Sequence, residues 1–422
     1  MKLAVIGAGS TYTPELVSGL MREQERLAVR ELVLHDVDAE RLEVVGGLAE
    51  RMLERQGYRG ALALTGELDR ALEDAEFVLI QLRVGGQAAR LRDETIPSAC
   101  GCVGQETTGA GGLGKAMRTV PVVLEIAERA RRLASDRAWI VDFTNPVGIV
   151  TRALLDAGHR AIGLCNVAIT FQRQIAARLG VAPERVFVDQ VGLNHLTWIR
   201  AVHLDGRDVL SDVLRSFGDE LAREIELPRP VLDALGAIPS YYLRYFYAER
   251  EVVAEQQVEP PRAQVVADIE RQLLELYRDP SLAEKPALLE RRGGAFYSEA
   301  AVALVASLTA DTGDVQVVDV RNQGTLAGLS DDDVVEVPAR IGSTGAEPLP
   351  QTPLATELLG LVQHVAAYER LAAKAARSGD RDVARMALMA HPLVREYRLA
   401  DDMLEPLLAT ETQPPAATQV GQ

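Results

Sequence analysis

Two side chains that favour transition metals, Cys165 and His195, stand thirty residues apart near the middle of the chain. Cys165 ends the apolar run RAIGLC, and His195 ends the sequence GLNH. A thiolate and an imidazole form a partial metal site that leaves positions open for substrate oxygens. This spacing is no local metal motif, so an inert cysteine and a histidine satisfied within the core remain the alternative. Cys100 and Cys102 form a C-x-C pair, which more often means two unrelated cysteines.

Tyrosines gather in one later segment, IPSYYLRYFY at 238–247, although the whole chain has only ten. A tyrosine near a metal or another cation loses its proton more easily and can serve as a base. From the residues alone, an aromatic packing cluster on a helix is the simpler interpretation. Arg83, in QLRVGG, follows an apolar run and precedes a glycine turn. That position suits a phosphate contact and equally suits a surface salt bridge.

A glycine pair near the N-terminus indicates a bound dinucleotide. Gly7 and Gly9 directly follow the apolar run KLAVI. The first glycine permits a tight turn, and the second lets the backbone approach a pyrophosphate, which the N-terminus of the next helix attracts. Asp36, at the end of the second apolar run, is placed to accept hydrogen bonds from an adenosine ribose and favours NAD over NADP. Tyr12 replaces the third glycine of the fingerprint, so an ordinary strand–helix turn with Asp36 as a helix cap is the alternative.

Short apolar runs that alternate with helical patterns must position these residues. Proline suits the first turn of a helix, so one helix is expected to begin near Pro14. Alternation of strands and helices predicts a parallel sheet that is covered on both faces, with Cys165 at its carboxyl edge, where such sheets bind ligands. Strands are expected at 2–6, 31–36, 77–82, 138–143 and 160–165, and further helices at 38–56 and 115–134.

The pattern changes after about residue 183, where RVFVDQVGLNHLTWIRAVHLDG alternates apolar and polar residues and predicts antiparallel strands. Mixed helices are expected over 219–310, strands over 314–337, and long helices over 353–377 and 380–408. We therefore predict an α/β fold with a Rossmann-type, doubly wound parallel sheet and a second mixed α/β (α+β) catalytic lobe. The predicted units are an NAD-binding domain at 1–175, a substrate domain at 176–410 and a disordered tail at 411–422.

The composition limits the partners and the compartment. The 422 residues carry a formal net charge of −16, which repels nucleic-acid phosphates, so no nucleic-acid partner is expected. We find no signal peptide and no run of about 18 apolar residues, so no membrane span is expected. Three cysteines are too few for a disulfide framework and indicate a reducing compartment, the cytoplasm.

Nine segments, in order from the N-terminus to about residue 340, resemble glycoside hydrolase family 4. A single glycine motif can arise by chance, whereas nine ordered segments are hard to explain in that way. The segments are VIGAGSTYTPELV (5–17), QLRVGGQAARLRDETIP (81–97), GQETTGAGG (104–112), DFTNPVGIV (142–150), GLCNVA (163–168), GLNHLTW (192–198), IPSYYLRYFY (238–247), RRGGAFYSEAA (291–301) and DDVVEVP (332–338).

The resemblance implies two cofactors. One is NAD, bound by the Rossmann-type domain. The other is a divalent metal ion of the manganese type, Mn²⁺, held by Cys165 and His195. The residues expected to contact NAD are Gly7, Gly9, Ser10, Thr11 and Asp36.

The resemblance also implies how the substrate is held and cleaved. Tyr242 is the best match to a catalytic tyrosine base, with Tyr241 as the fallback. Asn145 and Arg83 match residues that hold the sugar or its phosphate, and Arg292 is a second candidate for the phosphate. The implied reaction is hydrolysis of an O-glycosidic bond by NAD-assisted oxidation at C3, elimination and water addition, so NAD is needed but not consumed.

The substrate subtype depends on the residues after Cys165. Asn166 resembles the Cys-Asn-Val-Pro pattern of 6-phospho-β-glucosidases, although Ala168 replaces the proline. A 6-phospho-β-glucoside is therefore expected, with an unphosphorylated or α-linked glycoside as the alternative within the family. An NAD-dependent dehydrogenase of the lactate or malate type is an alternative of another class, and a catalytically inactive sugar–nucleotide sensor is disfavoured because Cys165, His195 and Tyr242 occur together. The resemblance suggests a homodimer or homotetramer.

Overall fold

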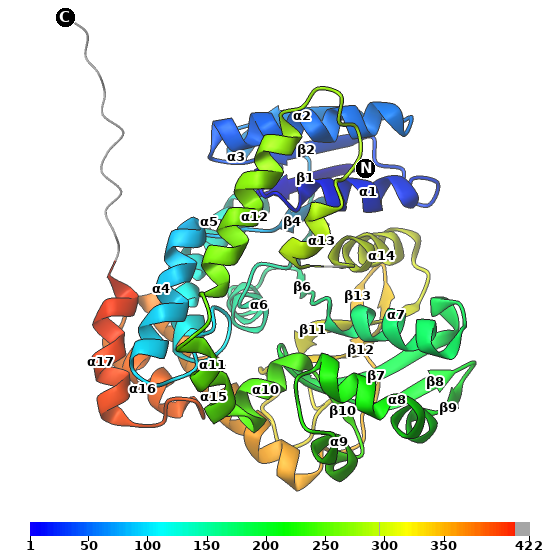
Figure 1. Cartoon of the computed structure of the whole chain (residues 1–422). Helices are drawn as coiled ribbons and strands as arrows, with labels where there is room; N and C mark the ends of the chain where they lie inside the picture. The colour runs from blue at the N-terminus through cyan, green and yellow to red at the C-terminus, as the bar shows by residue number, and fades with distance from the viewer. Residues whose placement is uncertain (295, 410–422) are drawn as a thin grey trace, which may run out of the picture.

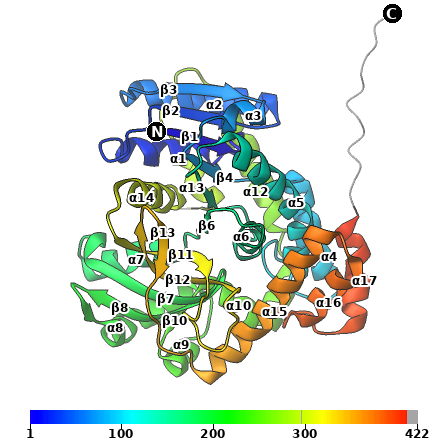
Figure 2. The same cartoon turned by 180° about the vertical axis from the view of Figure 1, so that it is seen from behind.

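One mixed sheet runs through the molecule in the computed structural model, which describes residues 1–294 and 296–409 (Figures 1 and 2). Six parallel strands form its N-terminal part in the order β3-β2-β1-β4-β5-β6. This is the strand order of a Rossmann-type sheet, so the expected fold class is confirmed. The strands are β1 (Lys2–Ile6), β2 (Glu31–His35), β3 (Ala61–Thr65), β4 (Phe77–Ile80), β5 (Trp139–Asp142) and β6 (Ala161–Gly163).

Five of the six parallel strands form where short apolar runs are buried on both faces, whereas the edge strand β3 is mostly exposed or half-buried. All four residues of β4 are buried, as are the last four of β1 and of β2. The helices between them begin at residues that suit a first turn. Helix α1 (Thr13–Arg22) has Pro14 in its first turn, and the Asp38 side chain caps α2 (Ala39–Arg55) by accepting from the Arg41 N–H. The expected start near Pro14 and the helix at 38–56 are therefore confirmed.

The second half of the chain extends the same sheet with antiparallel strands. Strand β11 pairs with β6 at Asp319 and Gly163, and β12 pairs with β7 at Glu336 and Gly192. A two-residue loop, Asn194–His195, joins β7 to β8. The strands are β7 (Val186–Leu193), β8 (Leu196–Leu204), β9 (Arg207–Asp208), β10 (Ile238–Pro239), β11 (Asp314–Arg321), β12 (Val334–Gly342) and β13 (Gly345–Pro348).

Helices from the second half of the chain pack against the helices that surround the N-terminal part of the sheet. Helix α12 packs against α2 and α4, α14 against α1, and α15 against α5 and α6. Both views show the C-terminal helices beside α4.

The expected boundary between an NAD-binding domain at 1–175 and a substrate domain at 176–410 stays a prediction. The remaining helices are α3 (Leu68–Leu72), α4 (Gly86–Ala99), α5 (Gly109–Leu133), α6 (Val147–Asp156), α7 (Val167–Leu179), α8 (Leu210–Glu224), α9 (Arg229–Leu235), α10 (Arg244–Tyr247), α11 (Glu249–Gln256), α12 (Arg262–Tyr277), α13 (Leu288–Arg292), α14 (Tyr297–Ala310), α15 (Thr356–Ser378), α16 (Arg381–Ala390) and α17 (Tyr397–Leu408), with short 3₁₀ turns η1 (Pro183–Arg185) and η2 (Tyr241–Leu243).

One expected helix is wrong. The segment 380–408 forms two helices, α16 and α17, because His391 precedes Pro392 and takes an extended conformation, φ −78° and ψ 130°. A proline ring disfavours the helical region for the residue before it. The expected disordered tail at 411–422 lies outside the described residues. Within the described part of the chain, no helix combines the length and apolar character needed to cross a membrane.

Candidate active site

Cys165 lies just beyond the carboxyl end of β6, at the start of α7, and its side chain is buried. Burial first, and then the carboxylates of Glu336 and Asp319, raise the pKa of its thiol well above the usual range. The Tyr297 hydroxyl lies 3.9 Å from Sγ. A thiolate here needs a positive charge beside it, and a bound metal ion provides one. The cysteine itself is a free thiol, as are Cys100 and Cys102.

His195 occupies the tight loop between β7 and β8 with a positive φ of 63°. Its Nδ1 lies 2.9 Å from Oγ1 of Thr107. Its Nε2 is buried and has no hydrogen-bond partner among the described residues. Burial, reinforced by the positive charge of Lys115, lowers the pKa of His195 to about 3. The ring is therefore neutral at physiological pH, which is the state that ligates metals.

Two tyrosines join Cys165 to His195. The Tyr242 ring stacks on the His195 ring with centroids 3.6 Å apart and an interplanar angle of 11°, and the Tyr241 ring lies 4.6 Å from that of Tyr242. Both tyrosines pack against the buried cluster that contains Cys165. The pKa of Tyr242 is raised well above its usual range, mostly by burial and to a smaller extent by the neighbouring Tyr241 and Cys165. The structure thus brings the four side chains into one site.

The chemistry of this donor set fits a catalytic metal ion. A neutral imidazole with an unpartnered nitrogen and a thiol beside a tyrosine pair are ligands that such an ion prefers. Among residues 1–294 and 296–409, no group of three or more His, Cys, Asp or Glu side chains is arranged to hold a metal. Catalytic metal sites differ from structural ones in keeping a position for water or substrate, and two protein ligands suit the catalytic kind.

The turn after β1 is built on two glycines at which the structure leaves no room for a side chain. Gly7 has a φ of +92°, and a Cβ on it would lie 2.8 Å from the carbonyl oxygen of Gln81. The Gly9 N–H donates to Oδ2 of Asp36 at 2.7 Å, and a Cβ on Gly9 would lie 2.8 Å from the same oxygen. Asp36 therefore also holds the glycine turn itself. Ser10 accepts a hydrogen bond from the Tyr12 N–H through its hydroxyl.

Tyr12 explains why the glycine fingerprint is incomplete. Its hydroxyl accepts from the Ser298 N–H at 3.1 Å, and its ring meets the Tyr297 ring edge-on at the start of α14. Helix α1 is thus fixed against α14 through an aromatic contact at the third glycine position. Thr11, next to it, is buried, and its hydroxyl lies 3.4 Å from Oε1 of Glu270 on α12.

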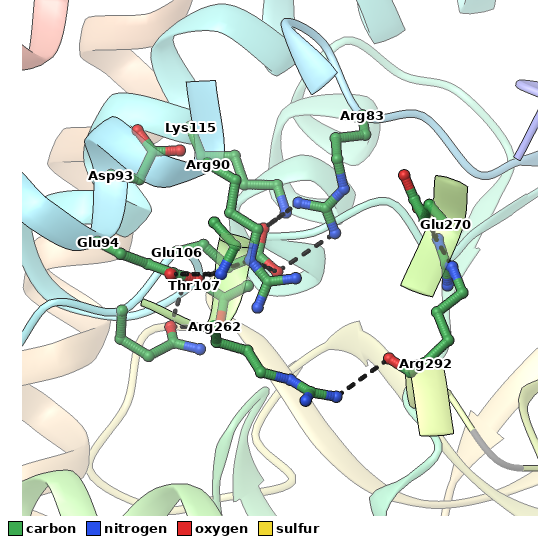
Figure 3. A network of polar contacts seen from close by, with 12 residues as sticks. Arg83, Arg90, Asp93, Glu94, Glu106, Thr107, Lys115, Arg262, Glu270 and Arg292 are labelled. Carbon is green, nitrogen blue, oxygen red and sulfur yellow. Dashed lines mark hydrogen bonds and ion pairs between the residues drawn. The ribbon is translucent and has the colours of Figure 1, made fainter. Parts of the chain in front are cut away.

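A network of charged residues lies around Glu106 (Figure 3). Arg83 forms a short ion pair with Glu106, Lys115 Nζ lies 2.6 Å from Oε2, and Arg90 Nε lies 3.3 Å from Oε1. Burial alone would raise the pKa of Glu106, but the charges of Arg83, Lys115 and Arg90 outweigh it and hold that pKa well below the usual range. Three cations share this carboxylate, although Arg90 also pairs with Glu94 at 2.7 Å.

Arg292, the second phosphate candidate, belongs to the same region. Its guanidinium lies 3.1 Å from Oε1 of Glu270. Burial first, and then the positive charge of Arg83, lowers the pKa of Arg292. Arg262 donates to the backbone carbonyl of Arg291 and to that of Arg292, which Figure 3 labels. The two arginines singled out in the sequence are thus brought together, on a side of the site that is rich in positive charge.

Two asparagines border the site at the carboxyl edge of the sheet. Asn145 follows β5, and its Oδ1 is buried without a hydrogen-bond partner among the described residues. Asn166 is buried at the first turn of α7, directly after Cys165. An amide oxygen held in such a position can accept a hydrogen bond from a sugar hydroxyl.

Sequence reasoning missed Thr107, Glu106, Lys115 and Arg90. The first three lie in or just after the segment GQETTGAGG, which contributed to the family resemblance but received no role of its own. The run of polar residues from Gln105 to Thr108, directly before a helix rich in glycine and apolar residues, is the signal that could have indicated a buried polar site. Polar side chains at such a position are either solvated or bound within a site.

Comparisons with known proteins agree with this geometry. A model described as "Family 4 glycosyl hydrolase" matches residues 2–181, and one for the family 4 C-terminal domain matches residues 190–394. The chain is 42% identical to a probable 6-phospho-β-glucosidase of Bacillus subtilis, over 97% of this chain and 96% of that protein. It is 30% identical to a phospho-α-glucosidase of Clostridium acetobutylicum, over 96% of both chains. The structure of the 6-phospho-β-glucosidase from Thermotoga maritima with manganese, NAD⁺ and glucose-6-phosphate aligns with a TM-score of 0.90 at 36% identity, over 97% of each chain.

Proposed function

The chain belongs to glycosyl hydrolase family 4, and on that premise we propose that it hydrolyses 6-phospho-β-glucosides with NAD and Mn²⁺ as cofactors. The observation that carries this is the near full-length similarity to 6-phospho-β-glucosidases at 36–42% identity, against 30% for the phospho-α-glucosidase. The expected alternative of a lactate- or malate-type dehydrogenase has no comparable support.

The residues around Cys165 and His195 would hold the reacting part of the sugar. When bound, NAD accepts a hydride reversibly and the metal ion acts as a Lewis acid at the sugar hydroxyls. Tyr242 is the proposed base that takes the proton from C2. Its buried phenol remains protonated near neutral pH unless positive charge lies beside it, because burial raises its pKa. Asn145 and Asn166 are proposed to orient the sugar hydroxyls.

The charged network around Glu106 is the proposed place for the 6-phosphate. A dianion needs several local cations because the chain as a whole is strongly acidic. We propose Arg83 and Arg292 as direct contacts, since guanidinium groups bind phosphate oxygens in pairs. Lys115 and Arg90 contribute further positive charge, since both pair with Glu106, the carboxylate that also pairs with Arg83.

The nucleotide is proposed to lie on the turn after β1. Gly7, Gly9, Ser10 and Thr11 would surround the pyrophosphate at the start of α1, and Asp36 would accept from the adenosine ribose. Support comes from the positive φ of Gly7 and from the close approach of Gly9 to Asp36, which leaves no room for larger residues.

We further propose a cytoplasmic enzyme that forms a homodimer or homotetramer. A reducing compartment suits a site whose ligand Cys165 must stay a thiolate, and all three cysteines are free thiols. Size-exclusion chromatography with light scattering tests the oligomer directly.

The deciding experiment is release of p-nitrophenol from its 6-phospho-β-glucoside, with and without NAD and Mn²⁺ under reducing conditions. The proposal predicts release that needs both cofactors and produces no net NADH. Release only from an unphosphorylated or α-linked analogue would keep the reaction and change the substrate. Steady NADH accumulation without cleavage would overturn the proposal in favour of a dehydrogenase.

A further inference from the structure

His195 is held by a neighbour that the proposed function does not yet use. Its Nδ1 lies 2.9 Å from Oγ1 of Thr107. Thr107 precedes α5, whereas His195 lies in the loop between β7 and β8, so the contact joins segments 88 residues apart. Either atom could donate the proton in this contact, and the choice decides which nitrogen of His195 keeps a lone pair for a metal.

The partners of Thr107 settle the direction of the hydrogen bond. The backbone N–H and the hydroxyl of Thr107 both contact the same atom, Oε1 of Gln105, the hydroxyl at 2.8 Å. A backbone N–H can only donate, so the Gln105 atom facing it must be the carbonyl oxygen, which can only accept. The Thr107 hydroxyl therefore donates its hydrogen bond to Gln105. Toward His195 the hydroxyl oxygen presents a lone pair, so it can only accept.

It follows that Nδ1 of His195 carries the proton and donates a hydrogen bond to Oγ1 of Thr107. Nε2 then bears the lone pair, and this is the nitrogen that is buried without a hydrogen-bond partner in the described chain. Metal-bound histidines generally donate their second ring nitrogen to an oxygen, which fixes both the tautomer and the ring orientation.

We infer that Thr107, anchored by Gln105, is a positioning residue that fixes His195 in the Nδ1–H tautomer and presents Nε2 to the metal ion. This inference rests on the proposed function, because it concerns the same metal site. It assigns to the segment before α5 a role in metal affinity that is separate from the charge network of Glu106.

Mn²⁺ binding to the full-length, NAD-bound protein tests the inference without any turnover. Free Mn²⁺ is followed by electron paramagnetic resonance in the parent and in Thr107→Val, Thr107→Ser and Thr119→Val. Thr107→Val should weaken binding by about 10- to 100-fold, the usual effect of losing such a partner. Thr107→Ser keeps the hydroxyl and should restore affinity close to that of the parent. Thr119→Val is the matched control, because Thr119 is buried and its hydroxyl has no partner among the described residues.

Nitrogen chemical shifts of the imidazole rings provide a second readout that a purely structural role would not change. The His195 signals are assigned by their loss in His195→Gln. The parent should show the Nδ1–H tautomer, and Thr107→Val should show a mixture. Unchanged Mn²⁺ affinity in Thr107→Val, or a proton on Nε2 in the parent, would overturn the inference. Failure of the parent itself to bind Mn²⁺ would instead overturn the metal site of the proposed function.

Discussion

Two adjacent phenols, those of Tyr241 and Tyr242, lie between the proposed metal ligands, and their chemistry differs by position. Tyr242 stacks on His195, whereas the pKa of Tyr241 is raised by burial first and then by the charge of Cys165. The two are close enough to interact, since a hydrogen bond with Tyr242 partly lowers the pKa of Tyr241. The proposed base, Tyr242, thus has a second phenol directly beside it, and mutation of each tyrosine distinguishes the two.

Tyr242→Phe should lower kcat by about 10²- to 10⁴-fold, the usual contribution of a positioned base. Tyr241→Phe is the matched control, since it removes one hydroxyl from the neighbouring ring, and it should retain most of the activity. Turnover of a substrate deuterated at C2, in ordinary water, should also release the label. Full activity in Tyr242→Phe with an inactive Tyr241→Phe would move the base by one residue, and retention of the label would contradict proton removal from C2.

At the scale of elements, the end of β2 and the turn after β1 depend on each other. Asp36 receives the Gly9 N–H, and Arg41 on α2 donates to the carbonyl of Gly9 at 3.0 Å. The acidic residue that would bind the ribose is thus also part of the glycine turn. Its carboxylate charge should set the choice between NAD and NADP, and its oxygen atoms should set the shape of the turn.

Asp36→Asn separates these two roles, because asparagine keeps an acceptor for Gly9 but loses the charge. The ratio of NADPH to NADH affinity should rise on the order of tenfold, since a carboxylate beside the 2′-phosphate is repulsive even where solvent screens it. Fluorescence titration with both reduced cofactors measures the ratio. Asp38→Asn is the control, because it removes a charge two residues away at the cap of α2. An unchanged ratio in Asp36→Asn would show that Asp36 does not face the ribose.

At the scale of the whole molecule, buried carboxyl groups collect where the parallel and antiparallel parts of the sheet meet. Asp142 on β5, Asp319 on β11, Glu336 on β12 and Glu369 on α15 are all buried. Burial raises the pKa of each of them, to about 8 for Asp142 and Glu369. The junction of the two lobes therefore favours bound protons, which links its stability to pH.

Glu369→Gln should flatten that pH dependence. The pKa of Glu369 is about 8 in the folded protein against an ordinary 4.5, so the folded state binds the proton more tightly. Its contribution to stability is fully present below about pH 4.5 and is lost as pH rises through about 8. The slope in that window is at most about 1.4 kcal/mol per pH unit for one group.

Urea unfolding at pH 5 and pH 8 measures this effect. The free energy of unfolding of Glu369→Gln minus that of the parent should be more positive at pH 8 than at pH 5. Glu357→Gln, an exposed position on the same helix, is the control and should differ from the parent equally at both pH values. The same constant difference in Glu369→Gln would contradict the link between this carboxyl and pH.

The sequence by itself determined five of the six parallel strands, because strands buried on both faces leave continuous apolar runs, and Pro14 and Asp38 mark helix starts locally. The edge strand β3 was not expected, because most of its residues are exposed or half-buried and leave no such run. It also indicated Gly7, Gly9 and Asp36, whose spacing reflects one strand–turn–helix unit. Family resemblance pointed to Cys165, His195 and Tyr242. The break between α16 and α17 has a local cause, Pro392, which the apolar periodicity of 380–408 does not reveal.

Only the tertiary structure decided which distant residues share the site. Thr107 meets His195 across 88 residues. Arg83 and Arg292 come close enough to interact because α12 packs against α2 and α4 and holds α13 beside it. Such contacts depend on how helices pack on a sheet, and no local pattern of apolar residues encodes them. The tautomer of His195 follows from hydrogen-bond directions at Thr107 and Gln105, which exist only once the chain is folded.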